Sequence, residues 1–154
     1  MVIKGFSSLF FRGLTLSFIF LLAGCPGQGD RLQLDETTQV NLIGDNVCFY
    51  IANAQDYQPT ILSINPRGTP PKKQAFIDNP SLSIKSGQLC IPPSFYKFES
   101  NKKYIVDFVL ASDRNIDELR KFVVGVGLNQ GQVYNFPLTD LEILRPYGSI
   151  EVSE

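Results

Sequence analysis

The chain has 154 residues, no histidine and no tryptophan, and its 14 basic side chains nearly balance its 15 acidic ones. The length suits one domain with one core. The lack of histidine excludes Ser-His-Asp and Cys-His catalysis and removes the commonest zinc and copper ligand, and a slightly acidic chain lacks the basic field that binds nucleic acid. We therefore expect a binding protein without enzymatic activity, cofactor or bound metal.

Residues 1–24 have the pattern of a bacterial lipoprotein signal peptide. Two basic residues precede an apolar run over residues 14–22, which ends in the small pair Ala23-Gly24 followed by Cys25. The run is shorter than the roughly 20 residues of a membrane span, and small residues before a cysteine are typical of a cleaved lipoprotein signal. We expect Cys25 to become the acylated N-terminus, lipid-anchored on the periplasmic side of the cell envelope. Pro26 replaces the aspartate that commonly retains lipoproteins at the inner membrane, which favours the outer membrane.

The remaining sequence predicts a tether over residues 25–36 and a single β domain over residues 37–154. Alternating apolar and polar residues predict the first strands over 38–42, 47–53 and 60–65. Prolines and glycine over residues 66–71 predict a loop, because proline lacks the backbone donor of a strand.

Short strands are then expected over residues 74–77, 82–85 and 88–91, the last ended by Pro92-Pro93. The clearest alternation covers residues 103–111, whose second face is half apolar and so favours a central position in a sheet.

The C-terminal third predicts one short helix and one hairpin. Residues 113–121 are the plausible helix, with Asp113 or Asn115 as its N-cap. The hairpin joins residues 121–128 to 132–138 through a turn containing Gly131. Apolar residues within the segment 140–154 would suit the cover of a sheet edge.

Seven or eight short strands favour an immunoglobulin-like antiparallel β-sandwich, with a small β-barrel as the alternative. Phenylalanine or tyrosine must fill the core position that tryptophan usually takes in that fold. Once Cys25 is acylated, Cys48 and Cys90 remain in an oxidising compartment, and each lies in a strand-like run. We predict a disulfide between them that joins two core strands, because a reactive thiol would require a CxxC motif or a histidine that the chain lacks.

Other residue groups have structural explanations that outweigh functional ones. Asp113, Asp117 and Glu118 form the densest acidic group, which helix capping and solvation explain, since a calcium loop would need a central glycine. The segment 125–127, Gly-Val-Gly, predicts close strand packing or a bulge rather than a phosphate loop.

An aromatic cluster at Phe95, Tyr96 and Phe98, with Lys97 between them, has the composition of a binding hot spot. Aromatic residues also pack readily beneath loops, and we favour this interpretation. The three aromatics remain the candidates for contact with a partner, and Tyr57 and Tyr147 are weaker ones.

The segment Cys25–Arg31 reads CPGQGDR, and it is followed by Val47-Cys48-Phe49 and later by Leu89-Cys90. In these landmarks the chain resembles a family of small enterobacterial lipoproteins described as type VI secretion system immunity periplasmic lipoproteins. The resemblance implies a protein that binds and neutralises a toxic effector delivered into the periplasm. The alternative is a structural or assembly lipoprotein that binds another envelope component.

Overall fold

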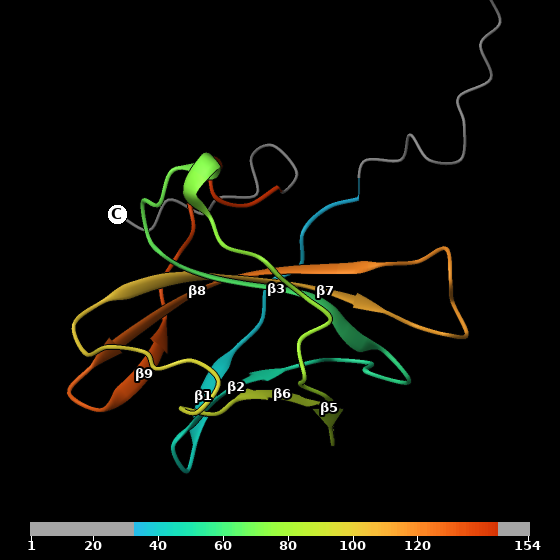
Figure 1. Cartoon of the computed structure of the whole chain (residues 1–154), viewed down its shortest axis with the longest axis horizontal. Coiled ribbons are helices and arrows are strands. Elements are labelled where there is room, and N and C mark those ends of the chain that lie inside the picture. Colours follow the sequence, from blue (N-terminus) through green and yellow to red (C-terminus); the bar gives the residue numbers. More distant parts are fainter. Residues whose placement is uncertain (1–32, 145–154) are drawn as a thin grey trace, which may run out of the picture. The chain divides into compact units, whose positions relative to one another are not determined.

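The computed structural model describes residues 33–144, so the predicted signal peptide, Cys25 and Tyr147 lie outside the described residues. Nine strands and one short 3-10 turn, Pro71–Lys73, make up the regular structure of this range, which contains no α-helix. The strands form two antiparallel sheets that pack as a sandwich (Figure 1). The predicted fold class is thereby confirmed.

The first sheet has four strands in the order β1, β2, β6, β5, and the second has five in the order β4, β3, β7, β8, β9. This is the immunoglobulin-like arrangement of strands A-B-E-D facing C′-C-F-G, with β9 added beside β8. The first sheet comprises β1 (Val40–Ile43), β2 (Asn46–Tyr50), β6 (Gln88–Ile91) and β5 (Ile84–Lys85). The second comprises β4 (Ile77–Asp78), β3 (Gln58–Pro66), β7 (Lys103–Ala111), β8 (Arg120–Asn129) and β9 (Gln132–Asn135).

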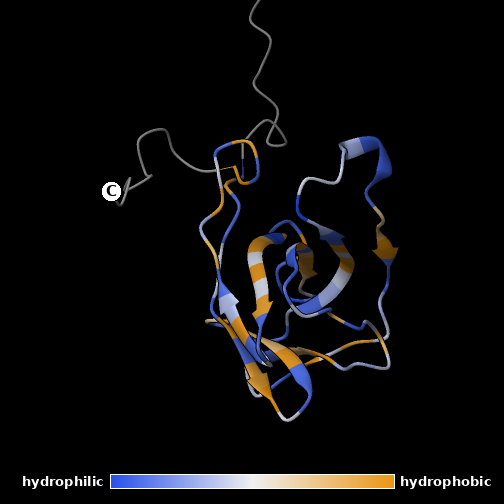
Figure 2. Ribbon diagram, turned by 90° about the vertical axis from the view of Figure 1, so that its left-hand side faces the viewer, coloured by the Kyte–Doolittle hydropathy of each residue, from blue (hydrophilic) through white to orange (hydrophobic). Residues whose placement is uncertain are grey.

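The core lies between the two sheets and is rich in aromatic residues. Figure 2 shows hydrophobic and hydrophilic residues alternating along the strands. In β7 every second side chain, from position 104 to 110, is buried, and the strand lies centrally between β3 and β8 as its alternation predicts. Phe49 of the first sheet meets Phe108 of the second with ring centroids 5.5 Å apart, and Phe108 stacks on Phe122 at 4.9 Å. Phenylalanines therefore fill the space expected for tryptophan.

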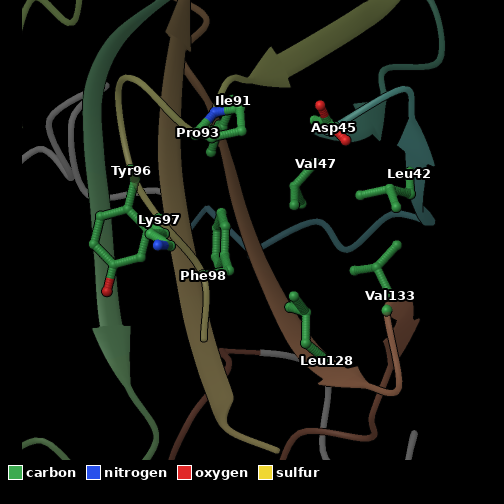
Figure 3. Close-up of a pocket in the computed structure, with 11 residues that line it drawn as sticks. Leu42, Asp45, Val47, Ile91, Pro93, Tyr96, Lys97, Phe98, Leu128 and Val133 are labelled. Atoms are coloured by element: carbon green, nitrogen blue, oxygen red, sulfur yellow. The ribbon is translucent and has the colours of Figure 1, made fainter. Parts of the chain in front are cut away.

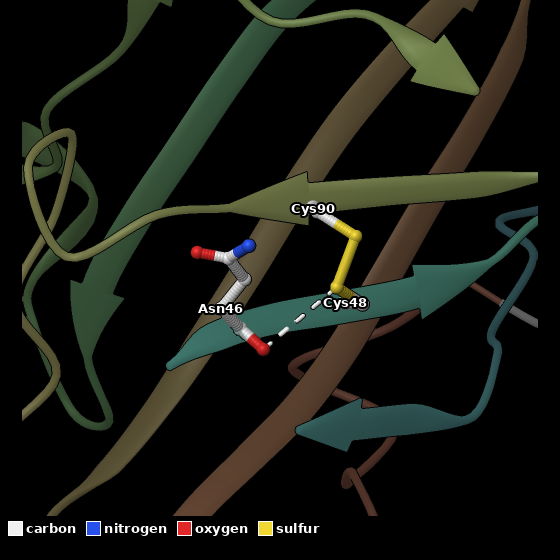
Figure 4. The surroundings of a disulfide bond; sticks show 3 residues. All are labelled: Asn46, Cys48 and Cys90. Atoms are coloured by element: carbon white, nitrogen blue, oxygen red, sulfur yellow. Dashed lines mark hydrogen bonds between the residues drawn. A yellow bond between two sulfur atoms is a disulfide. The ribbon is translucent and has the colours of Figure 1, made fainter. Parts of the chain in front are cut away.

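The disulfide Cys48–Cys90 joins two neighbouring strands of the four-stranded sheet (Figure 4). The two cysteines are direct partners in the pairing of β2 with β6, and their Cα atoms are 4.0 Å apart. The predicted link between two core strands is confirmed. In antibody domains the conserved disulfide instead connects the two sheets, so the sheets of this protein are held together by other contacts.

One of those contacts is a seam between β1 and β9, the edge strands on one side of the sandwich. The side-chain oxygen of Asn135 accepts a hydrogen bond from the backbone N–H of Val40, and its amide nitrogen donates to the carbonyl of Thr38, both at 3.0 Å. The two hydrogen bonds of this one side chain stand where a barrel would have a continuous ladder of backbone hydrogen bonds. The sandwich is closed on this side.

The N-terminal segment is a second connection between the sheets. Asp35 and Glu36, assigned to the tether from the sequence, both pair with other backbone groups: the N–H of Glu36 donates to Lys121 at 2.7 Å and its carbonyl accepts from Val123 at 2.8 Å. The guanidinium of Arg120 holds the Glu36 carboxylate through two hydrogen bonds of 2.7 and 2.6 Å. The chain therefore contacts β8 before it enters β1.

The expected helix over residues 113–121 is wrong. Residues 113–119 form turns instead, and Ser112 organises their start by accepting hydrogen bonds from the backbone N–H groups of Arg114 and Asn115 at 3.1 Å. Ile116 is 83% exposed. A helix of one or two turns pays the full nucleation cost, and this segment has no apolar face to bury in return.

Several expected strands are shorter than the patterns predict. The segment 74–77 contributes only its last residue to β4, and β2 ends at Tyr50 rather than at position 53. The hairpin is confirmed, but its second strand ends at Asn135 because Pro137 lacks a backbone donor. Its turn places Gln130 and Gly131 at φ angles of 49° and 75°, the left-handed pair that suits a two-residue hairpin turn.

Residues 136–144 cover the outer face of the five-stranded sheet rather than its edge. Phe136, Leu138 and Ile143 are buried there against Val123, and form a second small core. The two glycines of β8 allow the chain to lie close to the sheet: a Cβ at position 127 would lie 2.2 Å from the ring of Tyr134, and one at position 125 would lie 2.5 Å from the carbonyl oxygen of Phe136. The close packing predicted for these glycines is confirmed.

Candidate functional site

A groove of about 320 Å³ opens at one end of the sandwich. It lies between the β1–β2 turn, the β8–β9 turn and the connection that follows β6 (Figure 3). We call it the loop-end groove. Its lining residues are Leu42, Asp45, Val47, Ile91, Pro93, Tyr96, Lys97, Phe98, Leu128, Gly131 and Val133.

Two cross-strand pairs, one from each sheet, give the loop-end groove its apolar interior. Val47 of β2 lies opposite Ile91 of β6, and Leu128 of β8 lies opposite Val133 of β9. The first pair is fully buried and the second is half-buried. Leu42, the partner of Val47 in β1, extends the apolar surface outward and is 42% exposed. The groove is thus an extension of the main core toward solvent.

The aromatic cluster predicted from the sequence forms one wall of this groove. Tyr96 and Phe98 line it, and each meets Tyr104 of β7 edge to face, with ring centroids 5.9 and 5.1 Å apart. The hydroxyl oxygen of Tyr104 accepts a hydrogen bond from the backbone N–H of Glu99 at 3.0 Å, which fixes the connection against β7. Burial raises the pKa of Tyr96. This wall is held in place by packing.

Two exposed side chains of opposite charge flank the opening. Asp45 belongs to the β1–β2 turn and Lys97 to the connection after β6, and Figure 3 shows them on opposite sides of the groove. An apolar interior with a polar rim is the usual anatomy of a protein-binding surface. The groove suits an apolar group whose flanks carry charges complementary to these two residues.

The other predicted binding residues lie elsewhere. Phe95 does not line the groove and packs against the main core. Tyr57 is buried, and its hydroxyl donates to the carbonyl of Glu118 at 3.1 Å, which explains it as a structural residue. Sequence patterns missed the apolar lining residues of the strands, because each belongs to an ordinary strand and only the topology brings them together.

Charged groups on the outer face of the five-stranded sheet hold the terminal segments. Arg67 donates two hydrogen bonds to Glu142, and this interaction lowers the pKa of Glu142 to about 2. Burial raises the pKa of Asp107 to about 6, with Lys121 opposing the rise and Asp35 adding to it. Lys121 also pairs with Asp35 at 3.0 Å. These groups have structural roles.

Two structural searches of the described range bear on the choice of a candidate site. Within residues 33–144 no three aspartate, glutamate or cysteine side chains gather as metal ligands would. None of these residues forms a helix with the length and apolar character needed to cross a membrane. The loop-end groove itself presents apolar surface, one carboxylate and one ammonium group. We therefore take it as the candidate site.

Comparison with known proteins identifies a family for this sequence but no activity. No curated protein and no solved structure matches the chain. A family described as "Domain of unknown function (DUF7480)" matches residues 35–131, which is more than half of the chain and runs from the first pairing with β8 to the β8–β9 turn. The chain belongs to the DUF7480 family.

Proposed function

We propose that this protein is a periplasm-facing lipoprotein, anchored through acylated Cys25, that binds a protein partner in the loop-end groove. The partner we favour is a toxic effector of a type VI secretion system, which the protein would neutralise. The observation that carries the binding proposal is the groove, whose apolar interior lies between Asp45 and Lys97. The choice of effector rests on the resemblance of the N-terminal CPGQGDR segment and the two cysteine landmarks to immunity lipoproteins.

The construction of the groove supports this role. Its walls come from the ends of paired strands and from an aromatic cluster packed on β7, and the disulfide links β2 to β6, the strands that carry Val47 and Ile91. A preorganised surface loses little conformational entropy on binding, and this increases affinity. An inhibitor that acts by occlusion needs such a surface and no catalytic group.

An alternative partner is a structural or assembly component of the cell envelope. The same groove would serve it, because apolar contact with a charged rim does not distinguish between partners. The two functions differ in what the cell loses without the protein: immunity predicts intoxication by secretion-active siblings, and assembly predicts an envelope defect that does not depend on secretion.

The test is a deletion strain complemented with variants of neighbouring residues on opposite faces of β1. Leu42 lines the groove and is 42% exposed, and Ile43 is 49% exposed and does not line it. Burying a carboxylate against an apolar partner is costly, so Leu42→Asp should weaken binding by about tenfold or more, whereas Ile43→Asp should not. In competition with secretion-active siblings, we expect wild type and Ile43→Asp to protect the deletion strain and Leu42→Asp to fail.

Both variants must first show the thermal stability of the wild type. Equal protection by the two variants would move the partner site away from the groove. Equal survival of the deletion strain and the wild type would contradict immunity, and an envelope defect in both secretion-active and secretion-inactive deletion strains would then favour the assembly role.

A further inference from the structure

Three leucines are exposed at the corner of the domain where the described chain begins and ends. Leu34, Leu141 and Leu144 have exposed fractions of 42%, 99% and 41%. We call them the leucine corner. Single exposed apolar residues are common on protein surfaces, but three leucines from two chain segments at one corner form an apolar surface that the described residues 33–144 leave exposed.

The backbone holds these leucines near one another. The N–H of Asp35 donates to the carbonyl of Leu144 at 2.9 Å, and the N–H of Leu144 donates to the carboxylate of Asp35 at 2.8 Å. This pair of bonds places the residue after Leu34 in direct contact with Leu144. Ile143 is buried against the sheet, which fixes the turn that carries Leu141. The corner is therefore a defined part of the surface.

Two of the carboxylates beside the leucines are neutralised within the domain. Asp35 pairs with Lys121 at 3.0 Å, and Glu142 pairs with Arg67 at 2.7 Å. Glu142 also accepts a hydrogen bond from the backbone N–H of Thr139 at 2.8 Å. Paired carboxylates repel anionic lipid headgroups much less than free ones would. The surroundings of the leucine corner are thus compatible with a membrane surface.

The length of the N-terminal connection limits how far this corner can lie from a membrane. Leu34 is the ninth residue after Cys25, and even a fully extended chain of that length spans only about 30 Å. Acylation of Cys25 would therefore keep Leu34, and Leu144 whose backbone pairs with Asp35, within about 30 Å of the lipid anchor.

We propose that the leucine corner inserts into the boundary between headgroups and acyl chains of the bilayer that holds the Cys25 lipid. This inference rests on the proposed acylation of Cys25. The corner adds a second, protein-based contact to the lipid anchor, since partly inserted apolar side chains gain the free energy of leaving water. Such a contact sets the orientation of the domain on the membrane.

The absence of tryptophan from the chain provides a direct test. Leu141→Trp places a single tryptophan at the leucine corner, at a position already 99% exposed, so the fold should tolerate it. Tyr50→Trp is the matched control, because Tyr50 is 51% exposed on β2 in the other sheet. Both proteins are produced from the full chain, purified in their acylated form and reconstituted into phosphatidylethanolamine and phosphatidylglycerol vesicles, with and without lipids brominated near the headgroup.

We expect the emission of the tryptophan at position 141 to shift to shorter wavelength in vesicles and to be quenched by the brominated lipids, and that at position 50 to do neither. A Leu144→Trp variant should behave like the first, which guards against a local effect of one substitution. If the protein is acylated and bound to vesicles but the tryptophans at 141 and 144 are quenched no more than the control, the inference is overturned and the proposed lipid anchor stands. Protein without acyl groups by mass spectrometry would overturn both.

Discussion

Asp107 is a half-buried carboxyl group whose ionisation should destabilise the domain. It lies on the outer face of β7, between Ser63 of β3 and Val123 of β8 in the strand register. Burial raises its pKa from 3.8 to about 6, and the charges acting on it are Lys121, which lowers the pKa, and Asp35, which raises it. The folded protein therefore holds a proton here more tightly than the unfolded chain does.

The sign of the pH effect follows from this proton. Between about pH 4 and pH 6 the folded state binds more protons at this site, so the free energy of unfolding falls as pH rises through that window. A pKa difference of about two units corresponds to at most about 3 kcal/mol, and solvent access at the partly exposed carboxyl reduces the figure. Asp107→Asn keeps the shape and removes the charge, so it should stabilise the protein at pH 7 by about 1 to 3 kcal/mol.

Urea unfolding of the domain, followed by circular dichroism from about pH 4.5 to pH 7.5, measures this effect. The range avoids the region below pH 4.5, where the stability contributed by the lowered pKa of Glu142, about 2 in the folded state, is lost progressively as pH falls. Wild type should lose stability as pH rises to somewhat above 6 and then level off, and Asp107→Asn should show no such loss. Asp113→Asn, at an exposed position of the β7–β8 connection, is the control and should follow the wild type. Parallel profiles for wild type and Asp107→Asn would refute the reasoning.

Three further substitutions probe how the sandwich is held together, each by thermal or urea unfolding. Gly127→Ala should cost about 1 to 3 kcal/mol, because the new Cβ would lie 2.2 Å from the ring of Tyr134. Replacing Tyr134 by alanine as well should recover part of the loss. Stability losses that simply add in the double variant would contradict the clash. Asn135→Ala removes both seam hydrogen bonds and should cost about 1 to 3 kcal/mol, and unchanged stability would show that the seam contributes nothing. Replacing Cys48 and Cys90 together by serine should cost about 2 to 4 kcal/mol under non-reducing conditions. Under reducing conditions the wild type should lose stability and the double variant should not, so the difference between them should shrink.

The sequence was most informative where a strand has one buried face and one half-exposed face. The bounds of β6 and β7 agree with the predicted segments 88–91 and 103–111, because side-chain alternation and flanking prolines or polar turns mark both ends. The segment 113–121 misled because apolar residues three apart indicate a helix only if a partner surface exists to bury them. Whether such a surface exists is a tertiary property.

The candidate site was predictable only in part. Tyr96 and Phe98 drew attention through their composition, and they do line the loop-end groove. The other walls depend on which strand ends meet, which follows from the order of strands in the two sheets and not from any local pattern. Sequence patterns also could not predict that residues 136–144 cover the outer face of the sheet. This cover depends on two glycines in β8 that leave room for Tyr134 and the chain after it.

The pairing of Glu36 with β8 has a mechanical consequence. A load applied through the N-terminal segment does not reach the edge strand β1 first; it meets the bridge to Phe122 and the double hydrogen bond from Arg120. Strand β8 of the five-stranded sheet therefore bears tension from that end. The β1–β9 seam bears no load until the bridge between Glu36 and Phe122 breaks. With the N-terminal end held, a pull on the domain would therefore load β8 of the five-stranded sheet before it loads β1.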